Sequence, residues 1–182
     1  FFRVEKVDGK TKNDGAWMNF PSVSLFSSTA NADMTDFFRN MGCEASTNAY
    51  SIEGSTPLVD SLLSIRYGLY SWNQGSNPLL TLAGQEGDTW LYRKSFTLPL
   101  GFGISTDLED NWQLDLGNPA DVQDDLCTVL GTPWVLEEVY GEDGGGTYAY
   151  TVEAEADYYA YITNRPAKKV KVAWGEGSTT YD

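Results

Sequence analysis

Histidine is absent from the 182-residue sequence, and cysteine occurs only at Cys43 and Cys127. Without histidine, the chain lacks the commonest general base, the Ser–His and Cys–His nucleophile pairs and most zinc ligand sets. Two cysteines cannot build a structural zinc site or a disulfide-rich scaffold, and no redox motif surrounds either one. We expect two separate thiols, with a disulfide as the alternative in an oxidising compartment, and we expect no metal and no cofactor.

Basic residues are also scarce, since 12 lysines and arginines stand against 26 aspartates and glutamates, and the formal net charge is −14. Proteins that bind nucleic acid or an anionic membrane surface usually present a basic patch, so we expect no nucleic-acid partner. No apolar run approaches the ~20 residues of a membrane-spanning helix. The sequence has no initiator methionine, and a strand-like pattern begins at its first residue. We therefore expect that this chain is a piece of a longer protein.

The first part of the chain, residues 1–106, mixes strand-like runs with short amphipathic helices. Helix starts are predicted at Asn31, a good N-cap residue, and at Pro57, because proline suits the first helical position. Residues 73–88 are rich in Gly, Asn and Gln and predict a loop. Alternating or aromatic-rich runs predict strands at residues 1–7, at 16–20 with a continuation to 25–26, at 66–71, at 90–93 and at 101–104.

The second part, residues 107–182, begins with the best helical pattern of the chain, from Asn118 to Leu130. Beyond this helix the pattern is β, with alternation at 147–156 and 168–174 and a glycine-rich hairpin connection between strands at 141–146. We therefore predict an α+β fold, in which a mixed α/β N-terminal layer precedes a mostly antiparallel, β-sandwich-like C-terminal part. We expect a boundary near residue 106, with packing of both parts into one domain as the alternative.

Acidic side chains are the only acid–base candidates, and their patterns favour solvated surface positions. Glu137 and Glu138 are neighbours on a predicted strand, so they point to opposite faces. Asp124 and Asp125 lie on the polar side of a predicted helix. The acidic residues 107–112 resemble a calcium loop only weakly, since Trp112 stands where such a loop needs glycine. We assign no catalytic residue.

Aromatic residues make up 14% of the chain, and several lie beside Asn, Asp or Ser, as in sugar-binding sites. The rings could instead fill a small core and cover sheet faces. Ser27, Ser28 and Thr29 could cap a following helix or meet a polar ligand at its N-terminus, and the sequence Asn13-Asp14-Gly15 is first a turn and second a sugar contact. The candidate glycan contacts are Asn13, Asp14, Trp17, Ser27, Ser28, Thr29 and Trp72.

Five short blocks occur in order along the chain: Phe2-Arg3-Val4-Glu5-Lys6, Ser24-x-Phe26-Ser27-Ser28-Thr29, Gly54-x-Thr56-Pro57, Asn118-Pro119-x-x-x-Gln123 and Tyr161-Ile162-Thr163-Asn164-Arg165-Pro166. Together these blocks resemble the YfhO family of bacterial membrane proteins. One segment departs from the family pattern, because Trp17 to Pro21 stands where a tyrosine and a glycine are expected.

The resemblance implies a polytopic membrane glycosyltransferase that takes a sugar from a polyprenyl phosphate carrier and transfers it to an envelope polymer such as lipoteichoic acid. The present chain would be part of its extracytoplasmic domain, accessory to catalysis and in contact with the membrane portion of the same protein. The catalytic carboxylate of such enzymes lies between early membrane helices that are absent from this sequence. The alternatives are a carbohydrate-binding module and a purely structural interaction module, neither of them enzymatic.

Overall fold

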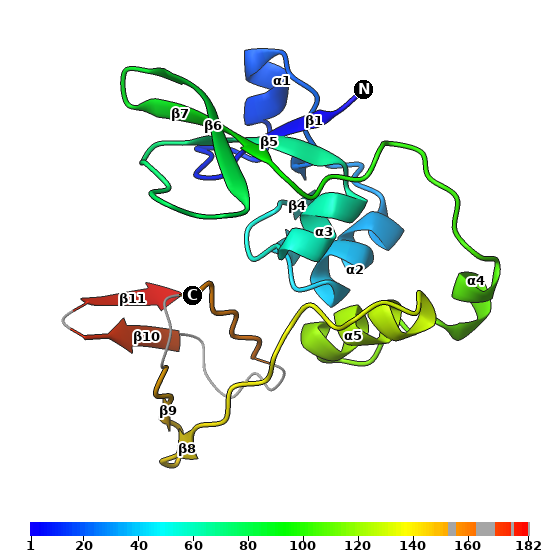
Figure 1. The fold of residues 1–182 in the computed structure, drawn as a ribbon, viewed down its shortest axis with the longest axis vertical. Coiled ribbons are helices and arrows are strands. Elements are labelled where there is room, and N and C mark those ends of the chain that lie inside the picture. The colour runs from blue at the N-terminus through cyan, green and yellow to red at the C-terminus, as the bar shows by residue number, and fades with distance from the viewer. Residues whose placement is uncertain (153–155, 163–169, 176, 182) are drawn as a thin grey trace.

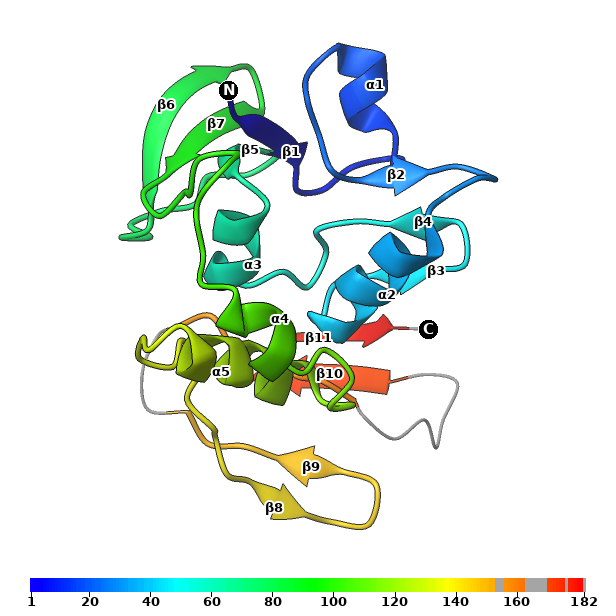
Figure 2. The same ribbon diagram turned by 90° about the vertical axis from the view of Figure 1, so that its right-hand side faces the viewer.

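The computed structural model describes residues 1–152, 156–162, 170–175 and 177–181 of the protein (Figure 1). Along the longest axis, one sheet and helix α1 lie at one end, helices α2 and α3 lie in the middle, and helices α4 and α5 follow (Figures 1 and 2). The C-terminal strands lie beyond the middle helices, far from the first sheet. The helices are α1 Asp14–Met18, α2 Ala32–Asn40, α3 Pro57–Leu62, α4 Asp107–Asn111 and α5 Pro119–Val129.

The sheet at the α1 end has four strands in the order β1-β5-β7-β6. Strand β1 runs parallel to β5, whereas the other neighbours pair antiparallel. A parallel pair needs a crossover connection, and here the connection contains α1, α2, α3 and a small antiparallel sheet of order β2-β4-β3. The strands are β1 Arg3–Lys6, β2 Leu25–Phe26, β3 Ala45–Ser46, β4 Ala49–Tyr50, β5 Ile65–Tyr70, β6 Leu80–Glu86 and β7 Thr89–Lys94.

Side-chain caps start the three main helices as the sequence predicts. Asn31 accepts a hydrogen bond from the Met34 N–H at 3.1 Å, and Asn118 accepts one from the Ala120 N–H at 3.1 Å. Thr56 caps α3, whose first residue is Pro57. Each cap satisfies a backbone donor that the helix itself leaves unpaired, so these short sequences fix the helix starts locally.

The hydrophobic core lies where α2, α3 and α5 meet the small sheet. Phe38 and Met41 are fully buried, and Phe38 stacks on Tyr50 with ring centroids 4.5 Å apart. Helix α5 adds Val122 and Leu126 to the same cluster. The expected boundary near residue 106 marks a change in sequence pattern, and helices from both sides of it contribute to one core.

The C-terminal strands form two hairpins, and both are antiparallel. The predicted hairpin connection is confirmed by a hydrogen bond from the Gly144 N–H to the Thr147 carbonyl at 2.8 Å. Residues 153–155 and 168–169 of the predicted strands, like 163–166 of the last family block, lie outside the described residues. Together the helices and mostly antiparallel strands confirm the α+β class. The hairpin strands are β8 Glu142–Asp143, β9 Tyr148–Ala149, β10 Val170–Trp174 and β11 Gly177–Tyr181.

Several local predictions are wrong. Glu137 and Glu138 lie on no strand. Residues 16–20 do not extend as a strand, because helix α1 covers Asp14–Met18 and ends at Asn19, which has a left-handed φ of 58°. Residues 73–88 are not all loop, since β6 pairs along its length with β7 and tertiary pairing overrides weak strand propensity. Residues 101–104 form no strand, because no neighbouring strand pairs with them.

Candidate functional site

A pocket of about 410 Å³ opens beside β1 at the sheet end of the molecule. The chain from Glu5 to Gly15 forms much of its wall, and two other segments, around Ser22 and around Ser51, complete it. Trp72, which follows β5, lies at the same pocket. Because these segments are far apart in sequence, only the folded chain creates the pocket.

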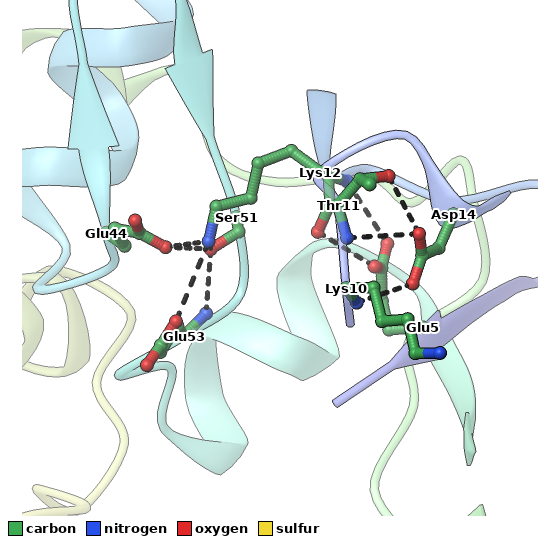
Figure 3. Close-up of polar contacts among 9 residues, drawn as sticks. Glu5, Lys10, Thr11, Lys12, Asp14, Glu44, Ser51 and Glu53 are labelled. Carbon is green, nitrogen blue, oxygen red and sulfur yellow. Dashed lines mark hydrogen bonds and ion pairs between the residues drawn. The ribbon is translucent and has the colours of Figure 1, made fainter. Parts of the chain in front are cut away.

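A carboxylate closes the loop that forms one wall of this pocket. Asp14 accepts hydrogen bonds from the backbone N–H groups of Lys10 at 2.9 Å and Thr11 at 3.1 Å, and from the Thr11 hydroxyl at 2.7 Å (Figure 3). The Thr11 hydroxyl is the main reason why the pKa of Asp14 lies below its ordinary value. Asp14 is therefore an ionised, fixed acceptor in the pocket wall.

A buried glutamate forms the floor between β1 and the chain that follows α1. Glu5 is 1% exposed and accepts hydrogen bonds from the hydroxyls of Ser22 and Ser24, each at 2.9 Å. The backbone N–H groups of Val23 and Ser24 also donate to it. Burial raises the pKa of Glu5, and these hydrogen bonds offset only part of that rise.

A lysine joins the pocket loop to the small sheet. The Lys12 ammonium pairs with Glu44, donates to the Ser51 hydroxyl at 3.1 Å and lies 3.6 Å from a carboxylate oxygen of Glu53 (Figure 3). Burial opposes ionisation of Glu44, but its bonds to Lys12 and Ser51 outweigh burial and lower its pKa. One cation thus holds two segments of chain on opposite sides of the pocket.

A second ion pair, Lys6 with Asp8, and the aromatic ring of Trp72 also line the pocket. Lys6 donates to Asp8 at 2.6 Å. Burial opposes ionisation of Asp8, but the interactions with Lys6 and Ser71 together outweigh it and lower the pKa of Asp8. The Trp72 side chain is half exposed, and its ring meets Tyr70 edge-on with centroids 5.8 Å apart. The edge-on contact orients the indole, which leaves an apolar surface beside several fixed hydrogen-bonding groups.

The structure brings together only part of the predicted site. Asp14 and Trp72 line the pocket, whereas the other predicted contacts do not. The Asn13 amide donates to the Phe26 carbonyl at 3.0 Å and accepts from the Phe26 N–H at 2.8 Å, which ties α1 to β2. Trp17 is 84% exposed on α1 and is not among the residues that line the pocket.

The serine-rich block also has a local structural role. The Ser27 hydroxyl accepts a hydrogen bond from the Thr29 N–H at 3.2 Å, and the Ser27 carbonyl accepts one from the Ala30 N–H at 3.1 Å. These bonds form a turn before α2, and Asn31 supplies the cap of that helix. The alternative that this block caps the helix is therefore wrong, because Asn31 supplies the cap. Ser28 is exposed in the same turn.

Sequence reasoning missed most of the pocket. Glu5, Lys12, Ser51 and Glu53 line it but were not among the predicted contacts. Glu5 gave no local signal, because Arg3 and Lys6 in the same strand run are also charged and the run reads as partly solvent-facing. Glu44 and Ser51, the partners of Lys12, lie 32 and 39 residues further along the chain, and no local pattern predicts them.

The remaining candidate groups take structural positions. Both cysteines are buried and carry free thiols, so the two separate thiols are confirmed. The acidic segment at 107–111 is helix α4. Within the part of the chain that the structure describes, no group of three or more acidic, histidine or cysteine side chains could hold a metal ion.

Comparison with known sequences gives the class of protein, a bacterial membrane protein. Residues 1–133 match the family described as Bacterial membrane protein YfhO. The chain belongs to the YfhO family. The matched range contains the pocket and the core helices, whereas the block at 161–166 lies beyond it. No curated protein and no solved structure matches the chain. Among the helices of the described residues, none is both long and apolar enough to cross a bilayer.

Proposed function

We propose that this chain is an extracytoplasmic domain of a polytopic bacterial membrane glycosyltransferase that decorates cell-envelope polymers such as lipoteichoic acid. In this function the domain is accessory to catalysis, and its partners are the membrane portion of the protein and a glycan or a polyprenyl-phosphate-linked sugar. The observation that carries the proposal is membership of the YfhO family over residues 1–133.

The form of the domain supports an accessory function. The pocket walls consist of ion pairs and hydrogen bonds made between side chains of the domain itself, as for Lys12 with Glu44 and for Asp14 with Thr11. Such groups are suited to holding a polar ligand in one orientation. The buried thiol of Cys43 is no nucleophile at neutral pH, because burial raises its pKa to about 12.

The location is tested by cysteine labelling in intact bacteria that produce the full-length membrane protein. Asp88 is exposed in the turn between β6 and β7, so Asp88→Cys presents a reactive thiol, whereas Cys43 and Cys127 are buried. A membrane-impermeant maleimide should label residue 88 of the Asp88→Cys protein in intact cells, so that this protein carries more label than the parent protein. Labelling of Asp88→Cys only after the cells are permeabilised would refute the extracytoplasmic location.

The accessory function is tested by activity and by envelope composition. The 182-residue chain alone should not turn over a polyprenyl-phosphate-linked sugar, and turnover would contradict an accessory function. Deleting the gene of the full-length protein should remove sugar from lipoteichoic acid, measured by mass spectrometry, and the full-length gene should restore it. Unchanged decoration would favour the second candidate, a carbohydrate-binding module without enzymatic function, which the Trp72 pocket also supports.

A further inference from the structure

The pocket beside β1 combines an aromatic ring with fixed polar groups and an excess of acidic side chains. We propose that it binds an uncharged saccharide ring and excludes phosphorylated sugars. The saccharide class rests on the proposed function, whereas the selection against phosphate follows from the charges of the pocket. The domain would then contact the glycan part of an envelope polymer rather than the phosphate end of a lipid carrier.

The dimensions and lining of the pocket fit one sugar ring. A volume of about 410 Å³ falls in the lower part of the range for small-molecule sites, roughly 300–1,000 Å³. Trp72 offers an apolar ring face against which C–H groups can pack, and Tyr70 keeps that ring oriented. Hydroxyl groups need acceptors and donors in fixed positions, and Asp14 and Ser51 supply them from opposite walls.

The polar walls are organised before any ligand arrives. Asp14 accepts three hydrogen bonds from Lys10 and Thr11, yet a carboxylate has about four acceptor positions, so it can accept a further one from a hydroxyl. Lys12 holds Glu53 and Ser51 beside it. Because these groups are already ordered, a ligand would lose little free energy in fixing them.

The charge of the lining disfavours a phosphate group. Four carboxyl groups, from Glu5, Asp8, Asp14 and Glu53, line the pocket with two ammonium groups, from Lys6 and Lys12. Each ammonium is already paired with a carboxylate. Even with Glu5 protonated, three carboxylates exceed two ammonium groups, and the whole chain carries −14. A dianionic phosphate would meet a net negative field without a free cation among the lining residues.

The test is ligand-observed NMR with the 182-residue chain, using methyl glycosides of glucose, galactose and N-acetylglucosamine and a glucose phosphate for comparison. We expect saturation-transfer signals from at least one methyl glycoside, with a dissociation constant of about 1 mM, and weaker signals from the glucose phosphate. Trp72→Ala should reduce affinity roughly three- to tenfold, the value of one aromatic contact, and Trp72→Phe should retain most of it.

Trp17→Ala is the matched control, because Trp17 is 84% exposed and lies outside the pocket lining. This variant should bind the glycoside like the parent protein. Absence of any glycoside signal, an equal loss in Trp17→Ala, or a glucose phosphate that binds as well as the glycosides would overturn the proposal. Circular dichroism of each variant separates a local loss of binding from unfolding.

Selection against phosphate has its own test in Glu53→Gln, which removes one exposed negative charge from the pocket rim. At a separation of ~8 Å in water, one charge changes the affinity of a dianion about sixfold without salt and about twofold at physiological ionic strength. In Glu53→Gln at physiological salt, the ratio of glucose phosphate affinity to glycoside affinity should therefore rise about twofold. An unchanged ratio would refute the electrostatic argument. The Asp88→Cys labelling result is independent of glycan binding, so failure of this proposal and failure of the proposed location are distinguishable.

Discussion

Replacing the buried glutamate of the pocket floor should cost much of the stability of the domain. In Glu5→Ala, the backbone N–H groups of Val23 and Ser24 lose their acceptor, and the hydroxyls of Ser22 and Ser24 lose theirs. A buried donor without an acceptor costs about 1–3 kcal/mol, so the two backbone N–H groups, which unlike the two hydroxyls cannot rotate to a new partner, give a loss of about 3 kcal/mol after partial rehydration. This is a large part of the roughly 5–15 kcal/mol that separates folded from unfolded domains.

The assay is urea denaturation of the 182-residue chain at neutral pH, followed by circular dichroism. Glu53→Ala is the matched control, since Glu53 belongs to the same pocket but its side chain is 67% exposed. The control should change the free energy of unfolding by less than about 0.5 kcal/mol. A loss below about 1 kcal/mol for Glu5→Ala would refute the contribution that we assign to its buried hydrogen bonds.

The same glutamate predicts a direction of pH dependence. Because burial raises the pKa of Glu5 above its ordinary value of 4.5, the folded state keeps this proton to higher pH than the unfolded state. Its contribution to stability is therefore full below the ordinary pKa and is lost as the pH rises through the folded pKa. The free energy of unfolding of the parent protein relative to Glu5→Gln should fall above pH 4.5; a constant or rising difference would contradict burial as the dominant cause.

Three further predictions concern the surrounding structure. Lys94→Met leaves the Asp60 carboxylate without its buried partner and should lower the free energy of unfolding by about 3–5 kcal/mol in urea denaturation. The double variant with Asp60→Leu should recover most of that loss, and a double variant as unstable as the single one would disprove this. Gly15→Ala brings a Cβ within 2.4 Å of the Ser22 Cβ, so α1 must move, and a loss of about 1–3 kcal/mol is expected in thermal unfolding; an unchanged melting temperature would show that the contact is not tight. Cys43, whose pKa burial raises to about 12, should react with a thiol reagent only after denaturation, and rapid reaction of the native chain would show that the core is open.

Local physics explains what could be predicted from the sequence. Asn31, Thr56 and Asn118 mark helix starts because a cap needs only a side chain within three residues of the donor that it satisfies. The α+β class likewise follows from short-range periodicity. The family is identified by ordered sequence blocks, and comparison over residues 1–133 confirms it.

Local patterns also led to the wrong predictions, each at a place where contacts outside the run itself decide the structure. The residues of α1 read as a strand, but Asp14 turns the chain and Gly15 packs against Ser22. Strand β6 read as a loop because its glycine and glutamine are weak strand formers, and pairing with β7 supplies the ladder that makes it a strand.

Composition and short-range patterns were enough to predict the class of fold, the main helix starts, the acidic charge and the family, because each depends on residues that are counted or that lie a few positions apart. The pocket shared by Asp14 and Trp72, with Trp17 outside its lining, is created only by the folded chain. Lys12 reaches Glu44 and Ser51 across long stretches of chain, and Glu5 finds its donors after α1. Such partners come into contact only when packing of the sheets and helices brings their segments together. Their spacing along the sequence therefore does not predict the contact.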